Sequence, residues 1–240
     1  MGHADVDPNI CINVKGEQVT VFQKMMQQWD ARAVRILLEF PTLDLCHFNG
    51  RAYRSAVMGT DEMFKELVDA GWVDLNVDVN MGLTGEKEET CTLLNAVVSI
   101  FDLEKLKLLL SRKENFDPCR TLGKLVPGVN HSFPSPLHWL PCAPKADVEN
   151  SKQMLDLLLQ VDGMDVNVQC DEDGEAPLHI ALRRDRGDLV SSLLRHPDIN
   201  LTLERVDEPR SVLALAKQNL TDPELLAELE VLFKAQMKTK

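Results

Sequence analysis

The chain has 240 residues, of which 44% are hydrophobic, 27% are charged and only 5% are aromatic. Such a chain is long enough for one large domain or two small ones, and its composition favours helices that pack through Leu, Ala, Val and Met. The formal net charge of −12 is spread evenly, with −6 in each half. Because the sequence has no basic stripe, we expect no nucleic-acid interface. The acidity favours solubility and would also speed the capture of a basic protein partner.

Six cysteines are scattered along the sequence without CxxC spacing, which argues against a zinc or redox centre. The sequence shows no signal-peptide pattern, and its most apolar run, Leu103 to Leu110, is interrupted by three charged residues. We therefore expect reduced thiols, no membrane association and a location in the cytoplasm or nucleus.

Residues 1–19 contain a proline, a glycine and several polar side chains, and they predict an irregular N-terminal arm. A first helical pair is predicted over 21–29 and 31–40. It ends at Pro41, because proline cannot continue a helix.

A second helical pair is predicted from residue 49 to Gly71, since glycine suits the left-handed position that follows a helix. The polar connection near 77–90 is expected to be an extended finger or a mobile loop. A third pair follows over 92–110.

A second irregular stretch, near 117–134, precedes the fourth unit at 135–159. Within that unit, residues 141–149 form an insertion between the two helices. The fifth unit covers 176–194, and the sixth covers 211–233.

The fourth and fifth units share a motif at the same place in each unit. Ser135-Pro136-Leu137-His138 matches Ala176-Pro177-Leu178-His179, and the units close with Asp165-Val166-Asn167 and Asp198-Ile199-Asn200. This repeated unit resembles an ankyrin repeat. The resemblance implies an all-α ankyrin-repeat solenoid of about six helix–turn–helix units over 20–235, followed by a polar tail at 236–240.

The spacing of the units tests this resemblance. A small-residue position of the first helix recurs at Ala56, Ala96, Leu140, Ala181 and Ala216. The intervals are 40, 44, 41 and 35 residues, whereas the ankyrin period is about 33. Every interval is longer than the period, and each excess coincides with a polar or Gly- and Pro-rich insertion. A true repeat with loop insertions predicts this pattern, whereas unrelated helices would deviate in both directions.

Several residues have structural roles within this unit. Ser135 can cap a helix through its hydroxyl, and the proline that follows suits the first turn. The resemblance implies that His138 and His179 form hydrogen bonds toward the neighbouring repeat. It also implies a glycine between the two helices of a unit, which in the fifth unit is displaced to Gly187.

Few residues point to catalysis. His138 and Cys142 are four residues apart, but Pro141 disrupts the helix that would bring them together. His131 and Cys142 would be the first candidates if the insertions built an enzyme active site. The sequence contains no phosphate-binding loop, nucleophile elbow or metalloprotease motif. We therefore expect no catalytic residue, no cofactor and no metal.

The resemblance implies that partners bind at the turn tips and on the exposed side of the first helices, along a concave face. Trp72 follows a predicted helix end, and tryptophan is enriched at the centres of interfaces. Trp139 falls at an inward position and is expected in the core. The predicted partner-binding residues are His47, Phe48, Met58, Trp72, His131, Ser132, Glu172, Asp173, Glu175, Arg183 and Arg184.

These features predict a monomeric, non-catalytic adaptor or inhibitor that holds a protein partner. The number of units and the acidic charge are similar to those of cytoplasmic inhibitors of NF-kappa-B-type transcription factors. Degenerate repeats with long insertions are also similar to the ankyrin effectors that intracellular bacteria inject into the host cytoplasm. An enzyme whose site is built from the insertions is a third alternative.

Overall fold

The computed structural model describes residues 7–14, 16–28, 30–43, 51–69, 76, 78–80, 90–112, 117, 119, 135–170, 173–206 and 211–238. The chain divides into two compact units, unit 1 (residues 1–132) and unit 2 (residues 133–240). Each unit is described by itself.

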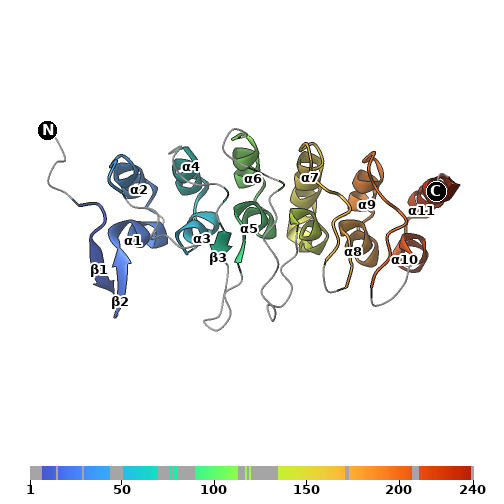
Figure 1. The fold of residues 1–240 in the computed structure, drawn as a ribbon, viewed down its shortest axis with the longest axis horizontal. Coiled ribbons are helices and arrows are strands. Elements are labelled where there is room, and N and C mark those ends of the chain that lie inside the picture. Colours follow the sequence, from blue (N-terminus) through green and yellow to red (C-terminus); the bar gives the residue numbers. More distant parts are fainter. Residues whose placement is uncertain are drawn as a thin grey trace. The chain divides into compact units, whose positions relative to one another are not determined.

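Unit 1 contains two short hairpins and three helical pairs among its described residues (Figure 1). The elements are β1 (Cys11–Val14), β2 (Glu17–Thr20), α1 (Val21–Gln28), α2 (Ala31–Leu38), α3 (Arg51–Met58), α4 (Asp61–Asp69), β3 (Asp78–Asn80), β4 (Thr90–Thr92), α5 (Leu93–Ser99) and α6 (Leu103–Leu110). Both hairpins are antiparallel, with Cys11 opposite Thr20 in one and Asp78 opposite Thr92 in the other.

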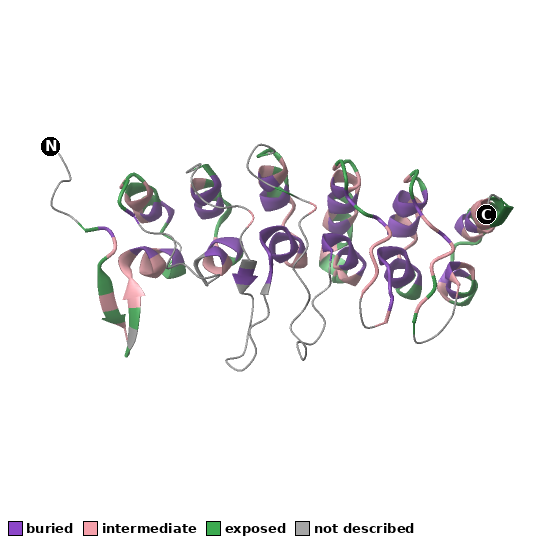
Figure 2. Ribbon diagram, in the orientation of Figure 1, coloured by how far each residue is buried: buried purple, intermediate pink, exposed green. Residues whose placement is uncertain are grey.

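The helices of unit 1 form two layers. The first helices of the pairs, α1, α3 and α5, lie in one layer and the second helices, α2, α4 and α6, in the other (Figure 1). The ribbon coloured by burial shows buried residues where the helices of the two layers face one another (Figure 2). The side chains of Asp30, Thr92 and Asp102 accept backbone N–H groups at the starts of α2, α5 and α6, which satisfies donors that a helix start leaves unpaired.

A buried lysine links two of the second helices of unit 1. The Lys105 ammonium contacts the carboxylates of Asp102, which caps α6, and of Asp61 in the first turn of α4, the latter at 2.9 Å. Burial opposes the charge on Lys105, but the hydrogen bonds to the two carboxylates outweigh it and raise the pKa of the lysine. This charged group therefore connects the second and third repeats.

The described residues of unit 2 contain two helical pairs and, before them, a repeat in which 3₁₀ turns precede a single helix. The elements of unit 2 are the 3₁₀ turns η1 (Pro136–His138), η2 (Leu140–Cys142) and η3 (Lys145–Asp147) and the helices α7 (Val148–Leu158), α8 (Pro177–Arg183), α9 (Gly187–Leu194), α10 (Val212–Asn219) and α11 (Pro223–Lys238). The first helices α8 and α10 pack side by side, and α7, α9 and α11 form the second layer (Figure 1).

The fourth repeat has no regular first helix. Its place is taken by η1 and η2, and Pro141 within η2 lacks the N–H that a continuing α-helix needs. The Ser135 hydroxyl accepts the Leu137 N–H at 3.2 Å, so the predicted cap is confirmed. Trp139, expected in the core, is only half-buried.

The repeat register read from the sequence holds in the structure. The side chains at the small-residue position, Ala56, Ala96, Leu140, Ala181 and Ala216, are all 0% exposed. In the fourth repeat, the extra residues include those of η2 and η3. The second to sixth repeats therefore bury the same position of the unit, although the intervals in the sequence differ.

Asparagine side chains tie the turn of one repeat to the turn of the next. In unit 2, Asn167 Nδ2 donates to the Asp198 carbonyl at 2.7 Å, and Asn167 Oδ1 accepts the Asn200 N–H at 2.8 Å. In unit 1, Asn76 Oδ1 accepts the Asp117 N–H at 2.7 Å. Because both sides of the amide can bond to backbone groups, one asparagine fixes the spacing of two adjacent turns.

The N-terminal residues differ from the predicted irregular arm. Asp7-Pro8-Asn9 is a further turn of the same type, since Asn9 donates its N–H to Asp7 Oδ1 at 2.9 Å and its side-chain amide to the Thr42 carbonyl at 2.8 Å. The β1–β2 hairpin follows directly. The described part of this segment is thus built like the start of a repeat.

The C-terminal residues differ from the predicted polar tail. Helix α11 continues to Lys238, and Gln236 lies against the last asparagine turn. Its amide donates to the Ile199 carbonyl at 2.6 Å and accepts the Leu201 N–H at 2.9 Å. These two bonds hold the end of the helix and provide hydrogen-bond partners for the Ile199 carbonyl and the Leu201 N–H of the turn.

The prediction that the inter-helix glycine is displaced to Gly187 is wrong. Gly187 begins α9, and Asp185 adopts the left-handed conformation, with φ 51°, that a glycine would take between the helices. The Asp185 carboxylate accepts the N–H and hydroxyl of Thr221 at 2.9 and 2.8 Å. Aspartate tolerates this backbone conformation, and its hydrogen bonds to the sixth repeat offset the strain.

We predict that Asn167→Ala lowers the free energy of unfolding by roughly 2 kcal/mol, because two hydrogen bonds between repeats are lost. Chemical denaturation followed by circular dichroism measures this change. Asn150→Ala on α7 is the matched control, since alanine favours a helix. A stability for Asn167→Ala within about 0.5 kcal/mol of the wild type would contradict the role of the asparagine.

Candidate protein-binding surface

Two buried histidines hold the hairpin that precedes each following repeat in unit 2. His138 Nε2 donates to the Glu175 carbonyl at 3.1 Å, and His179 Nε2 donates to the Leu203 carbonyl at 3.3 Å. His179 Nδ1 accepts the Ala176 N–H at 3.0 Å, which fixes the proton on Nε2. The predicted bonds toward the neighbouring repeat are therefore confirmed.

Glu175 lies between the fifth and sixth repeats, and its side chain is only 3% exposed. It receives the Arg183 guanidinium through two contacts, Nε to Oε1 at 3.0 Å and a terminal nitrogen to Oε2 at 2.5 Å. Arg205 Nε, from the hairpin of the sixth repeat, lies 3.4 Å from Oε1. One carboxylate thus holds two guanidinium groups from adjacent repeats, and the fork of Arg183 fits it in a fixed orientation.

The hairpins of the fifth and sixth repeats are tied together near their tips. Gly174, with φ 68°, passes so close to Val206 that a Cβ there would lie 3.0 Å from the Val206 nitrogen. The Val206 N–H donates to the Asp173 carbonyl at 2.9 Å. Gln169 donates its amide to the carbonyls of Gly174 and Glu204 at 2.6 and 2.9 Å. These bonds fix the two hairpins relative to each other.

The insertion in the fourth repeat is anchored from the fifth. The Arg186 guanidinium is held by the Asp188 carboxylate at 2.7 and 2.9 Å and donates to Ser151 Oγ at 2.8 Å. It also reaches the Leu140 carbonyl at 3.4 Å. Residues 141–149 are therefore held against the start of α9.

Cys142 and His138 do not form a Cys–His pair. The Cys142 thiol faces the His138 carbonyl at 3.8 Å, while the imidazole is turned toward the next hairpin. Burial raises the pKa of the Cys142 thiol, an effect that outweighs the opposing field of Arg184 and Arg183. The thiol therefore lacks the lowered pKa of a reactive nucleophile.

The predicted partner-binding residues fall into two groups. The first lies outside the described part of the chain and consists of His47, Phe48, Trp72, His131, Ser132 and Glu172. In the second group, Met58 is 49% exposed at the end of α3, Asp173 is half-buried, and Arg183 and Arg184 are exposed at the end of α8.

The structure corrects the prediction for Glu175, which belongs to the second group. It was predicted as a contact residue on the turn, but it is buried beneath Arg183. A buried carboxylate with two arginine partners positions those arginines and does not itself reach a partner.

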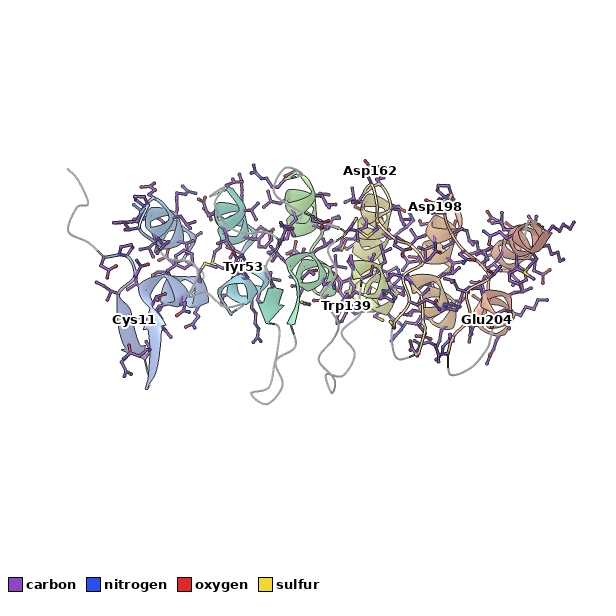
Figure 3. All side chains as sticks on the ribbon, in the orientation of Figure 1. Cys11, Tyr53, Trp139, Asp162, Asp198 and Glu204 are labelled. Atoms are coloured by element: carbon purple, nitrogen blue, oxygen red, sulfur yellow. The ribbon has the colours of Figure 1, made fainter. Side chains whose placement is uncertain are left out.

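Sequence reasoning missed two residues of this surface. Arg205 shares the Glu175 carboxylate, and Val206 is 72% exposed beside it. The same hairpin carries Glu204, which Figure 3 shows on the side of α8 and α10, away from Asp162 and Asp198. The repeat register did not mark them, because Glu204-Arg205-Val206 stands seven to five positions before Ser211, where Gln169-Cys170-Asp171 stands before Ala176.

Comparison with known proteins identifies the kind of protein. Residues 140–194 match the family model for ankyrin repeats. The human ASB11 ankyrin repeat domain has a similar fold, with a TM-score of 0.58 and 17% identity over 94% of this chain and 88% of that one. The ankyrin repeat domain of Bcl-3, a unique member of the IkappaB protein family, has a TM-score of 0.56 and 19% identity over 82% of this chain and 79% of that one. A comparison with curated protein sequences found no match.

Residues 140–194 thus match the ankyrin-repeat family, and the chain as a whole has the fold of ankyrin-repeat domains. The predicted fold class, an all-α ankyrin-repeat solenoid of about six helix–turn–helix units, is confirmed by these fold neighbours. Within the described ranges, no helix is both long and apolar enough to span a bilayer.

The buried histidines predict a loss of stability in mild acid. Burial lowers the pKa of His138 to about 4, from 6.5, and also lowers that of His179. The unfolded chain therefore binds more protons between pH 6.5 and 4, and stability falls as the pH is lowered through this window. His138 alone should account for roughly 3 kcal/mol at pH 4.

Urea denaturation of the wild type and of His138→Asn across this pH range measures the effect. The variant should be less stable at pH 7 but should show a shallower dependence on pH. His196→Gln, at a partly exposed position outside the core, should keep the wild-type slope. Equal slopes for the wild type and His138→Asn would refute the assignment.

The Glu175–Arg183 pair predicts a measurable coupling energy. In a double-mutant cycle with Glu175→Gln and Arg183→Gln, we expect about 1 kcal/mol, because the carboxylate is buried while Arg183 is 45% exposed. The exposed pair Glu104–Lys107, changed to glutamines, should give about 0.3 kcal/mol. A coupling no larger than in this control would show that Glu175 does not hold Arg183.

Proposed function

We propose that the protein is a non-catalytic scaffold, an adaptor or inhibitor, that binds a protein partner on the face formed by its first helices and hairpins. The observation that carries this proposal is the rigid surface of unit 2, which consists of Asp173, Arg183, Arg184, Arg205 and Val206 and is called here the hairpin face. It mixes an exposed apolar side chain with charges of both signs, as protein interfaces do.

The way in which the hairpin face is built favours binding. Gln169 and the Val206 N–H tie the two hairpins together, and Glu175 holds two of the arginines. Because these groups are ordered before a partner arrives, association loses little conformational entropy. Ankyrin-repeat proteins are typically interaction modules of this kind, which supports a role without catalysis.

The proposal includes a monomeric protein in the cytoplasm or nucleus, since the scattered cysteines suit a reducing compartment. The net charge of −12 favours encounter with a partner of net positive charge. An inhibitor similar to those of NF-kappa-B-type factors and a bacterial effector in the host cytoplasm are the two versions of this proposal. They differ in the partner and not in the binding surface.

The enzyme alternative depended on Cys142 and His131. His131 lies outside the described residues, and the raised pKa of the Cys142 thiol does not favour a nucleophile. Under our proposal, the double variant Cys142→Ala, His131→Ala keeps most of its affinity for the partner.

Affinity capture from cell lysate with mass spectrometry, followed by direct binding measurements with the purified prey, tests the proposal. Val206→Asp should weaken binding of the specific prey by about tenfold or more, since it places a charge on the exposed apolar contact. Arg195→Glu is the matched control, because Arg195 is exposed at the end of the second-layer helix α9. A prey bound equally by both variants would contradict the hairpin face.

A further inference from the structure

The charges around Glu175 do not balance locally. One buried carboxylate faces two guanidinium groups, those of Arg183 and Arg205, and Arg184 follows directly in the chain. We call Arg183, Arg184 and Arg205 the arginine cluster. Because one carboxylate is shared by two guanidinium groups, Glu175 cannot occupy all the donors of both.

The cluster is accessible to a partner. The side chain of Arg183 is 45% exposed and that of Arg205 is 17% exposed, while Arg184 is exposed at the end of α8. Both Arg183 and Arg184 lie within electrostatic reach of Cys142 in the fourth repeat, and Arg205 comes from the hairpin of the sixth. The cluster therefore joins the fifth and sixth repeats and lies near the fourth.

Arg183 is oriented for recognition. Its Nε and one terminal nitrogen are bound to Glu175, which fixes the plane of the guanidinium. A guanidinium has five N–H donors, so donors remain on its exposed side. A carboxylate that approaches from solvent would meet a donor group that is already ordered.

We propose that the arginine cluster binds carboxylate side chains of an acidic segment in the protein partner. This inference rests on the proposed function and specifies the chemistry of the partner. It differs from the expectation based on net charge, because screening limits the reach of distant charges to about 10 Å and the local groups decide what binds at one point.

The neighbours of the cluster define the kind of segment. Asp173 and the exposed Glu204 lie on the same pair of hairpins, and Val206 on the second of them is 72% exposed. A matching segment carries an acidic residue for the cluster, an apolar residue for Val206 and a basic residue for the hairpin tips. A partner of net positive charge can contain such a segment.

Polyanions fit this surface poorly. Nucleic acids and anionic membranes present rows of phosphates and are bound by extended basic surfaces. Here, three arginines stand beside Glu175, Asp173 and Glu204, so a second or third phosphate in a row would meet negative charge. The arginine cluster is large enough to bind one or two carboxylates.

Selection from a random phage-displayed peptide library on the full-length protein tests the inference. Enriched peptides should contain Asp or Glu, and the best of them is then synthesised with a fluorescent label. Its Kd, measured by fluorescence anisotropy, should rise about tenfold for Arg184→Glu, the usual effect of losing one charge-assisted hydrogen bond. Replacing the acidic residue of the peptide by its amide should have a similar effect.

Two further variants keep the test independent of folding. Arg183→Lys keeps the charge beside Glu175 but lacks the guanidinium fork, so it should fold as the wild type does and weaken peptide binding. Arg195→Glu changes charge to the same extent as Arg184→Glu and should leave the Kd unchanged. Circular dichroism and thermal melting confirm that each variant is folded.

The outcomes separate this inference from the proposed function. Peptides that lose affinity with Val206→Asp, but that lack acidic residues or bind Arg184→Glu normally, would overturn the arginine cluster and leave the scaffold in place. If no enriched peptide responds to any variant of the hairpin face, or if none is enriched, both proposals fail. Binding of a double-stranded DNA oligonucleotide as tightly as the peptide would also overturn the inference.

Discussion

The structure depends on hydrogen bonds that a polar side chain of one repeat makes to the backbone of the next. His138 and His179 bond to the hairpin carbonyls of Glu175 and Leu203, and Asn167 bonds to both sides of the following turn. Apolar packing alone would let neighbouring helical pairs slide, because it is non-directional. The hydrogen bonds of the imidazoles and amides form at only one spacing between adjacent repeats. A misplaced repeat would leave buried polar groups without partners.

These bonds also shape the hairpin face. The histidines hold each hairpin close to the end of the preceding repeat, which brings Glu175 beneath Arg183 and next to Arg205. Gln169 and the Val206 N–H then join the tips. The exposed charges and the exposed valine are therefore positioned by the same interactions that set the repeat spacing, so structure and binding are not separate properties of unit 2.

The sequence was sufficient for the fold because the repeat signals are local. The Pro-Leu-His motif, the closing asparagine turns and the buried alanines each need only a few adjacent residues, and their order fixes the register. Asp185 and the Asp7–Asn9 turn were missed. At Asp185, a residue other than glycine takes the left-handed position between two helices. At Asp7–Asn9, the turn occurs without the helical pair that precedes it elsewhere.

The binding surface was less predictable. The repeat register placed Arg183 and Arg184 at the end of a first helix. It could not show that Glu175 is buried and paired with Arg205, which lies thirty positions further along the chain. From the sequence alone, an acidic residue in a predicted turn is expected to be exposed to solvent. Only the packing of two hairpins shows that its role is to orient its basic neighbours.

The tie between the hairpin tips has one more consequence. Its bonds use backbone groups of Asp173, Gly174, Glu204 and Val206 and the amide of Gln169, whereas the side chains that face solvent take no part in that tie. Residues with other chemistry could therefore replace Glu204 or Val206 while the loops keep their shape, whereas the Asp173 carboxylate also accepts the Glu175 N–H within its own loop. The main chain sets the geometry of the hairpin face, so its preference for a ligand can change with the side chains while that geometry stays the same.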